Sequence, residues 1–422
     1  MTGSISLSNW ELTRLFLLVG LLLAAAHFFG YIFYKCKLPK VIGEIFGGFL
    51  LGKTVLGYFN PDIYLRLFDA FKEEGKLFSV FYWLGLIMLM FISGFEIQKS
   101  FDRDDKKIIT AIVLGSTVIP FTAGFIVPAC CGVAPFMGPK GNVLALQLIF
   151  GTAVAITAIP VIAKIFLDLN IMRTRFAKIV LTAATVHDVV LWCVLAIATG
   201  LVSTQAVAPV QIVSTVLVTA VFFGLSLMVM PRIVKFSNVL KYNLLIKSSV
   251  AGYALILCFI FVTLASVLRV NIVFGAFLAG IVVGFMPDEQ FEKGRAHIKE
   301  IALAFFIPLY FAIVGSRIDL IHCFDLKLFL GVMFFATLCV TAGTLLAART
   351  VTRDWLSGVN LAVAMNTRGA VGIVVATIAL DSGIINELFF VTLVLMAIVT
   401  TALTGYWLRY VLSRGWELFK IE

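Results

Sequence analysis

The chain has 422 residues, of which 61% are hydrophobic and 13% are charged, and its mean hydropathy is +1.07. This composition excludes an ordinary soluble protein, because so little polar surface would lead to aggregation, and it favours a polytopic membrane protein. The formal net charge of +10 indicates basic cytoplasmic loops rather than nucleic-acid binding, since no basic block is interleaved with aromatic residues.

Hydropathy predicts an all-α membrane protein with about 13 transmembrane helices. The expected limits are 11–34, 39–58, 77–97, 108–131, 143–168, 177–200, 209–231, 248–268, 271–286, 300–316, 326–348, 357–380 and 388–412. The first run is too long for a signal peptide and lacks a small-residue cleavage site, so we expect it to be retained. The chain ends soon after the last run, so no soluble regulatory domain is expected.

The loops at 35–40, 169–178 and 232–247 are rich in lysine and arginine and fall on one side if the expected spans alternate. The positive-inside rule makes that side cytoplasmic, with the N-terminus outside and the C-terminus in the cytoplasm. We expect the cell (inner) membrane as the location. The seven cysteines form no CxxC pair, which argues against a disulfide framework or a metal site.

The second expected span is rich in glycine, at spacings that allow helices to pack closely. Glu44 lies near its cytoplasmic end. This carboxylate either pairs at the interface with a basic residue such as Lys40 or lines the entry to a cation path.

The fifth expected span, 143–168, is interrupted. Pro160 removes a backbone donor and disfavours helical geometry at the preceding residue. Thr152 and Thr157 supply hydroxyl oxygens, and the freed carbonyls supply more. Unwound backbone is tolerated at membrane depth where it is buried in protein or lines a wet cavity. The pattern therefore predicts oxygen ligands for a monovalent cation; a proline kink used for packing alone is the alternative.

The sixth expected span carries His187 and Asp188 midway along an otherwise uncharged run. A carboxylate at the centre of a membrane helix costs about 3 kcal/mol on insertion scales, so it is usually functional. A carboxylate that holds either a proton or a cation is the minimum device for exchange. The alternatives are a structural aspartate in a helix–helix hydrogen bond and, for His187, a histidine that bonds to a neighbouring carbonyl or hydroxyl.

A second interruption is expected in span 357–380, where Asn366 and Arg368 precede two glycines. Interruptions in corresponding spans of two halves are typical of inverted-repeat transporters, with the site where the broken helices cross. Arg368 would neutralise the carbonyl ends of the half-helices there. The alternative is an arginine that snorkels to the membrane surface.

Several segments together resemble cation:proton antiporters of the Kef, CHX and bacterial Na+/H+ antiporter type. They are LPKVIGEIFGGFLLGKTVLG, TAIPVIAKI, TVHDVV, GAFLAGIVVG, PLYFAIVGSRIDL and MNTRGAVGIVVA. The resemblance covers about 38–410. It implies inverted repeats with two crossing broken helices and a homodimer. It also implies a core (approximately 108–200 and 326–412) that moves against a dimerisation scaffold (approximately 11–97 and 209–316).

By this resemblance the chain is an antiporter that exchanges H+ for Na+ or K+, in the service of pH homeostasis, with Asp188 as the shared site. Thr152 and Thr157 are candidate ligands, His187 tunes the site, and the crossing is supported by Arg368, Asn366 and Pro160. Charge counting favours electroneutral exchange. We expect no cofactor, no metal beyond the transported monovalent cation, and no partner beyond membrane lipid and a second copy.

Two departures from the family pattern stand out. First, the family usually has Asp-Asp or Asn-Asp where this chain has His187-Asp188, and Val340 stands about where Asp-Asp members often place a lysine. Second, we expect no nucleotide-binding domain of the kind that follows Kef membrane regions. Rival hypotheses are a transporter of an organic cation or other solute, and a channel or non-transporting sensor on the same fold. No nucleophile–base pair or phosphate loop points to an enzyme.

Overall fold

The computed structural model describes residues 7–36, 38–71, 74–96, 106–203, 209–228, 232, 244–286, 288–352 and 354–420. Nearly all of them are helical, and no strand occurs among them beyond one isolated bridge between Met137 and Ile385. The all-α prediction is therefore confirmed. Parts of the basic loops 35–40 and 232–247, and the expected span limits at 97 and 231, lie outside the described residues.

The contacts divide the chain into two compact units, residues 1–89 with 295–322 and residues 90–294 with 323–422. The first unit contains α1 (Asn9–Lys35), α2 (Lys40–Leu51), α3 (Leu56–Phe59), α4 (Pro61–Phe68), most of α5 (Glu74–Glu96), the end of α15 (Asp288–Ile301), the π-helical turn η2 (Ala302–Phe306) and α16 (Ile307–Arg317). Within it α2 packs against α1 and α16.

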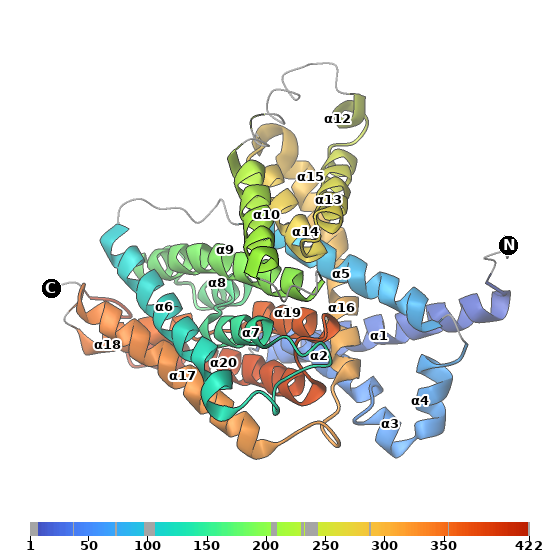
Figure 1. Ribbon diagram of the computed structural model, residues 1–422, viewed down its shortest axis with the longest axis horizontal. Coiled ribbons are helices and arrows are strands. Elements are labelled where there is room, and N and C mark those ends of the chain that lie inside the picture. The colour runs from blue at the N-terminus through green and yellow to red at the C-terminus, as the bar shows by residue number, and fades with distance from the viewer. Residues whose placement is uncertain are drawn as a thin grey trace. The chain divides into compact units, whose positions relative to one another are not determined.

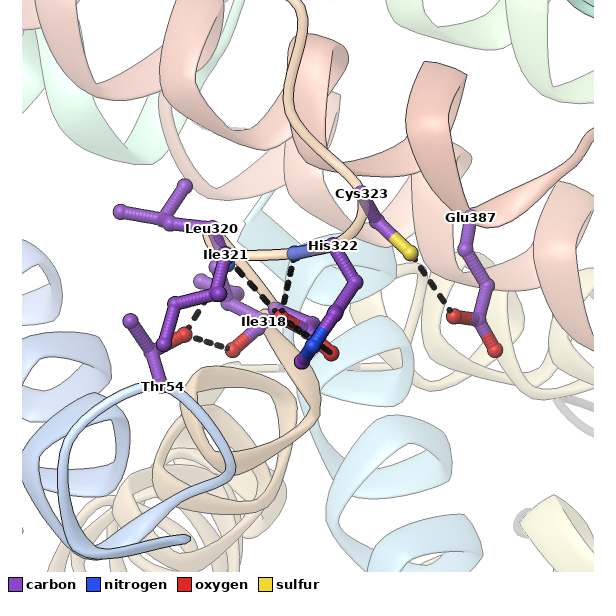
Figure 2. Close-up of polar contacts among 8 residues, drawn as sticks. Thr54, Ile318, Leu320, Ile321, His322, Cys323 and Glu387 are labelled. Carbon is purple, nitrogen blue, oxygen red and sulfur yellow. Dashed lines mark hydrogen bonds and ion pairs between the residues drawn. The ribbon is translucent and has the colours of Figure 1, made fainter. Parts of the chain in front are cut away.

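Thr54, in the turn that follows α2, makes hydrogen bonds to the connection that follows α16. Thr54 Oγ1 donates to the Ile318 carbonyl at 2.6 Å and accepts the Leu320 N–H at 3.0 Å (Figure 2). Asp319 accepts the N–H groups of Ile321 and His322 in the same turn. Partial burial raises the pKa of Asp319, but these hydrogen bonds outweigh it and lower the pKa below its ordinary value.

The second unit holds the remaining helices. They are α6 (Lys106–Cys131), α7 (Val143–Ala155), α8 (Ile159–Asp168), α9 (Arg175–Ser203), α10 (Pro209–Met228), α12 (Leu244–Ser248), α13 (Val250–Val267), α14 (Ile272–Gly284), α17 (Leu326–Arg349), α18 (Trp355–Met365), α19 (Gly369–Asp381) and α20 (Glu387–Ser413). Asparagine or aspartate side chains cap α7, α17, α18 and α20, which gives these helices sharp starts.

Two glycines let α6 and α17 run side by side (Figure 1). A Cβ atom on Gly115 would lie 2.3 Å from the carbonyl oxygen of Gly343, and one on Gly343 would lie 2.2 Å from that of Gly115. Only glycine permits backbones to approach so closely, and this small-residue contact is a common basis for helix association in membranes.

Ten helices within the described residues are long and apolar enough to cross a membrane, or eleven if the bent pair α18–α19 is one span. The segments Val210–Ser226 and Ile272–Gly284 are apolar but shorter. Every residue of α14 from Val273 to Gly284 is buried in protein, so this helix does not need the length that lipid exposure requires. Each expected span contains a helix, but the predicted total of 13 is not confirmed.

Candidate functional site

The first interruption separates α7 from α8 at residues 156–158, which are not helical. Pro160 occupies the first turn of α8, where its missing N–H removes no helical hydrogen bond. Ile156 and Ala158 adopt extended backbone geometry, so the chain leaves one helix and enters the next through about three unwound residues. All three are buried, so their polar backbone groups need partners within the protein.

The second interruption separates α18 from α19 at residues 366–368, and the two helices are bent by 42°. Gly369 starts α19 with a φ of +45°, a conformation that favours glycine. A Cβ atom there would also lie 2.5 Å from Val161 Cγ2 in α8. The backbone angle and the close approach to α8 both require glycine at this position.

The two interruptions meet. The N–H of Ala158 donates to the Thr367 carbonyl at 2.6 Å, and the Thr157 hydroxyl donates to the Met365 carbonyl at 2.5 Å. Each contact joins residues more than 200 positions apart in the sequence. The predicted crossing of two broken helices is therefore present, and the unwound segments satisfy part of each other's hydrogen-bonding demand.

Arg368 holds this crossing together from the inside. Its side chain is 1% exposed. Nε and Nη2 donate to the Ala153 and Val154 carbonyls at 3.3 and 3.0 Å, and Nη1 donates to Asn366 Oδ1 at 2.5 Å. The two carbonyls belong to the last turn of α7, where the helix dipole is negative, so the guanidinium lies where a cation is stabilised. Arg368 is thus buried and does not extend to the membrane surface.

Asn366 links Arg368 to a third helix. Its Oδ1 accepts from the guanidinium, and its Nδ2 donates to Thr337 Oγ1 of α17 at 3.3 Å. The sequence analysis selected Asn366 but not Thr337. Val340, one turn further along α17, is fully buried, so an apolar side chain stands about where the resemblance placed a lysine.

Asp188 and His187 lie on α9, which packs against α7, α8 and α18. Asp188 is 5% exposed and His187 is 0% exposed. Asp188 Oδ1 and both ring nitrogens of His187 have no hydrogen-bond partner among the described residues. Buried polar atoms are nearly always paired, so the unpaired atoms on a helix that contacts both interrupted helices make Asp188 and His187 the candidate functional residues.

The other predicted site residues are placed differently. The Thr152 hydroxyl donates to the Leu148 carbonyl of its own helix at 2.8 Å, the usual arrangement for a threonine in a membrane helix. Glu44 belongs to the first compact unit, where it is buried and its Oε1 lies 3.5 Å from Lys40 Nζ. The remaining predicted residues all belong to the second unit.

The contacts of α20 with the interrupted helix were not foreseen. Thr401 accepts the N–H of Gly369 at 3.0 Å, and Trp407 Nε1 donates to Asn360 Oδ1 at 2.9 Å. Polar residues that recur every three positions along an otherwise apolar helix are the signal that could have identified this face.

The site offers carboxylate, hydroxyl and carbonyl oxygens, which suit hard monovalent cations. Within the described parts of the chain no group of three or more histidine, cysteine, aspartate or glutamate side chains could hold a metal ion. Asp188 is therefore the candidate group for a proton or a monovalent cation, on a helix that packs against both interrupted helices.

Comparison with known proteins finds relatives that match most of the chain. The K(+)/H(+) antiporter 1 of Saccharomyces cerevisiae is 28% identical over 88% of this chain, and the chain spans only 43% of that protein's length. The Na(+)/H(+)-K(+) antiporter GerN of Bacillus cereus is 26% identical over 94% of this chain and 95% of that protein.

The sodium proton antiporter MjNhaP1 of Methanocaldococcus jannaschii has a similar fold, with a TM-score of 0.66 at 14% identity; the match covers 94% of this chain and 97% of that one. Residues 21–414 match the family described as sodium/hydrogen exchanger, transmembrane. The protein is therefore a multi-pass integral membrane protein that belongs to the sodium/hydrogen exchanger family of cation:proton antiporters.

Proposed function

We propose that this chain is a secondary antiporter that exchanges protons for Na+ or K+ across the membrane by alternating access. The relatives named above as K(+)/H(+) and Na(+)/H(+) antiporters support cation/proton exchange. The observation that carries the proposal is the buried Asp188, whose Oδ1 accepts no hydrogen bond from the described residues and whose helix contacts both interrupted helices.

Asp188 is the shared site for cation and proton in this proposal. A carboxylate in a dry environment is stable when neutralised, either by a covalently bound proton or by a cation coordinated to its oxygens. Hydroxyl and carbonyl oxygens from the crossing complete the coordination shell of the cation. Thr157 and Thr152 are the candidate hydroxyl ligands. The proton and the cation cannot occupy Asp188 at the same time, and this competition couples their fluxes.

Electroneutral exchange follows from charge counting. If the carboxylate alone changes partner, one proton is replaced by one monovalent cation, and the loaded site carries the same charge in both forms. Arg368 does not enter the charge count, because its guanidinium keeps its charge and its hydrogen bonds to the carbonyls at the end of α7 throughout the cycle. Exchange should then proceed at the same rate with or without a membrane potential.

Alternating access requires that part of the protein moves relative to the rest. We assign the moving core to approximately 108–200 and 326–412, and the scaffold to approximately 11–97 and 209–316. A homodimer joined through the scaffold would hold the scaffold still in the membrane. We place the N-terminus outside and the C-terminus in the cytoplasm, since the basic loops then face inward.

A proteoliposome assay tests the proposal. The purified protein is reconstituted with a pH-sensitive dye inside the vesicles, and Na+, K+ and Li+ are added outside in turn, with choline as the control cation. We expect proton efflux with at least one alkali cation and none with choline. Proton flux with choline would instead support a transporter of organic cations. Conductance without coupled proton movement would support a channel.

A further inference from the structure

One face of α20 presents polar side chains at intervals of three residues: Thr401, Thr404 and Trp407. Residues three or four apart share one face of a helix. Each of these three side chains makes a hydrogen bond to the interrupted helix α18–α19. We call this set the α20 ladder; α19 and α18 both pack against α20.

The rung at Thr401 bridges the interruption itself. Thr401 is 1% exposed, and its hydroxyl oxygen accepts the N–H of Gly369 at 3.0 Å. Gly369 is the first residue of α19, so its N–H has no acceptor in the preceding turn. A buried N–H without an acceptor is costly in an apolar interior. Thr401 thus supplies from α20 the acceptor that the broken helix lacks.

The other two rungs hold α18. Thr404 Oγ1 lies 3.0 Å from the Val363 carbonyl oxygen, in the last turn before the interruption, and 3.0 Å from the Thr400 carbonyl of its own helix, so its hydrogen is shared between the two. Trp407 Nε1 donates to Oδ1 of Asn360, which is 0% exposed, at 2.9 Å. The interrupted helix is therefore attached to α20 on both sides of the break.

The segment after α20 completes this attachment. Asn360 Nδ2 donates to the Leu418 carbonyl at 3.0 Å, and the N–H of Lys420 donates to Ser357 Oγ at 2.8 Å. Leu418 is buried. The amide of Asn360 is consequently satisfied on both its oxygen and its nitrogen, so α18 is fixed between α20 and the chain that follows it.

We propose that Thr401, Thr404, Trp407 and Asn360 are positioning residues for the cation site. They fix the geometry of the unwound residues 366–368 and, through these, the arrangement of oxygen atoms at the crossing. The inference rests on the proposed exchange function of the same site. It predicts that loss of a rung weakens cation binding more than it slows turnover.

Thr401→Val tests the central rung, because valine keeps the shape of threonine and lacks the hydroxyl. Thr401→Ser keeps the hydroxyl and should restore the wild-type value. Thr392→Val is a matched control, since among the described residues this buried threonine of the same helix bonds only to the Leu388 carbonyl of its own turn. In proteoliposomes we expect KM for the cation to rise about tenfold in Thr401→Val, with kcat within about twofold of wild type.

Hydrogen exchange provides a readout that does not depend on transport. Amides of residues 366–372 should exchange about tenfold faster in Thr401→Val than in wild type, Thr401→Ser or Thr392→Val, because the Gly369 N–H has lost its acceptor. Wild-type protection in Thr401→Val would overturn the proposal. An unchanged KM in that variant, with wild type active, would overturn it as well.

The failure of the proposed function gives a different result. If wild type shows no cation-dependent proton flux, antiport is wrong, and the effect on cation affinity falls with it. If wild type exchanges cations and only the Thr401→Val prediction fails, antiport stands and the positioning role is wrong. A fall in kcat without a change in KM in Thr401→Val would indicate a merely structural role and overturn the inference.

Discussion

At the scale of single residues, the polar groups of this site fall into two classes. Arg368, Asn366 and Thr157 have their hydrogen-bonding groups engaged by named partners, and these partners belong to the crossing. Asp188 and His187 are equally buried and have polar atoms without partners in the described structure. The first class holds the crossing together, and in the proposed function the Thr157 oxygen also contacts the cation through a lone pair that its hydrogen bond leaves free. The second class supplies the carboxylate that carries the ion in that proposal.

His187 is the residue that departs from the family pattern. If Asp188 alone exchanges its proton for a cation, His187→Asn should keep electroneutral exchange, because no titrating group is lost. The measurement is the initial rate of proton flux in vesicles at zero potential and at an imposed, inside-negative potential. We expect no dependence on potential in either protein.

A wild-type rate that responds to the potential would contradict electroneutral exchange. If that response then disappears in His187→Asn, the second proton belongs to His187, and the count becomes two protons per cation.

Residue chemistry explains which parts of the site were predictable from sequence. Pro160 and the segment Asn366–Gly369 predict the two helix interruptions, because proline lacks an N–H and glycine allows a positive φ. Nothing in the sequence around Thr401 predicts its contact with the interrupted helix. Threonines in apolar helices commonly bond to a carbonyl four residues back, as Thr152, Thr185 and Thr377 do here. That Thr401 accepts a hydrogen bond from the N–H of Gly369, 32 residues away, could therefore be seen only in the folded structure.

At the scale of elements, close contact between α6 and α17 depends on the pair Gly115 and Gly343. Gly343→Ala would place a methyl group 2.2 Å from the Gly115 carbonyl oxygen, so the helices must separate. Overpacking of this kind costs about 1–3 kcal/mol or more. We expect a lower thermal unfolding midpoint in detergent. Tryptophan fluorescence measures this midpoint.

Gly331→Ala on the same helix is the matched control, because an added methyl there meets no atom within 4 Å. Its unfolding midpoint should be no lower than that of wild type, because alanine is more favourable than glycine inside a helix. Equal midpoints for Gly343→Ala and Gly331→Ala would contradict the close packing of α6 on α17.

The start of α18 depends on its cap. Asp354 Oδ2 accepts the Ser357 hydroxyl at 2.5 Å and the Ser357 N–H at 2.7 Å, and these hydrogen bonds lower the pKa of Asp354 below its ordinary value of 3.8. A carboxyl with a lowered folded-state pKa stabilises the fold above its ordinary pKa, and this contribution is lost as the pH falls through the folded-state value.

Asp354→Ala should therefore lower the free energy of unfolding by about 1 kcal/mol at pH 7. The difference from wild type should shrink below pH 3.8. Asp354→Asn keeps a capping oxygen but lacks the charge, so its stability at pH 7 should fall between those of Asp354→Ala and wild type. Denaturant unfolding of the three proteins at pH 7 and pH 3 checks this, and a difference that does not depend on pH would refute the role of the charge.

The elements themselves were largely predictable, because uninterrupted apolar runs reveal membrane helices. The total was not. The segment Ile272–Gly284 is shorter than a usual span, and burial on all sides removes the need for a full-length lipid-facing surface. A hydropathy window averages over about twenty residues and does not distinguish a helix sheathed by protein from one that faces lipid.

At the scale of the whole molecule, family membership rests on a match over nearly the entire chain. The shared fold explains why two interruptions far apart in the sequence meet. Residues at such separations come together only when the helices between them are packed. Asp188 lies on α9, which contacts both interrupted helices. In the proposed function, a change of ion at Asp188 would act directly on the packing of α9 against these helices.

The central claim is that Asp188 carries the exchanged ion, and Asp188→Asn tests it most directly. Asparagine keeps the size and the polarity of the side chain and removes the titrating charge. Asp168→Asn, an exposed carboxylate at the end of α8, is the matched control. Both proteins and wild type are reconstituted at equal density, and cation-induced proton flux is recorded. The account predicts wild-type flux for Asp168→Asn and no flux above empty vesicles for a folded Asp188→Asn; retained exchange in Asp188→Asn would contradict it.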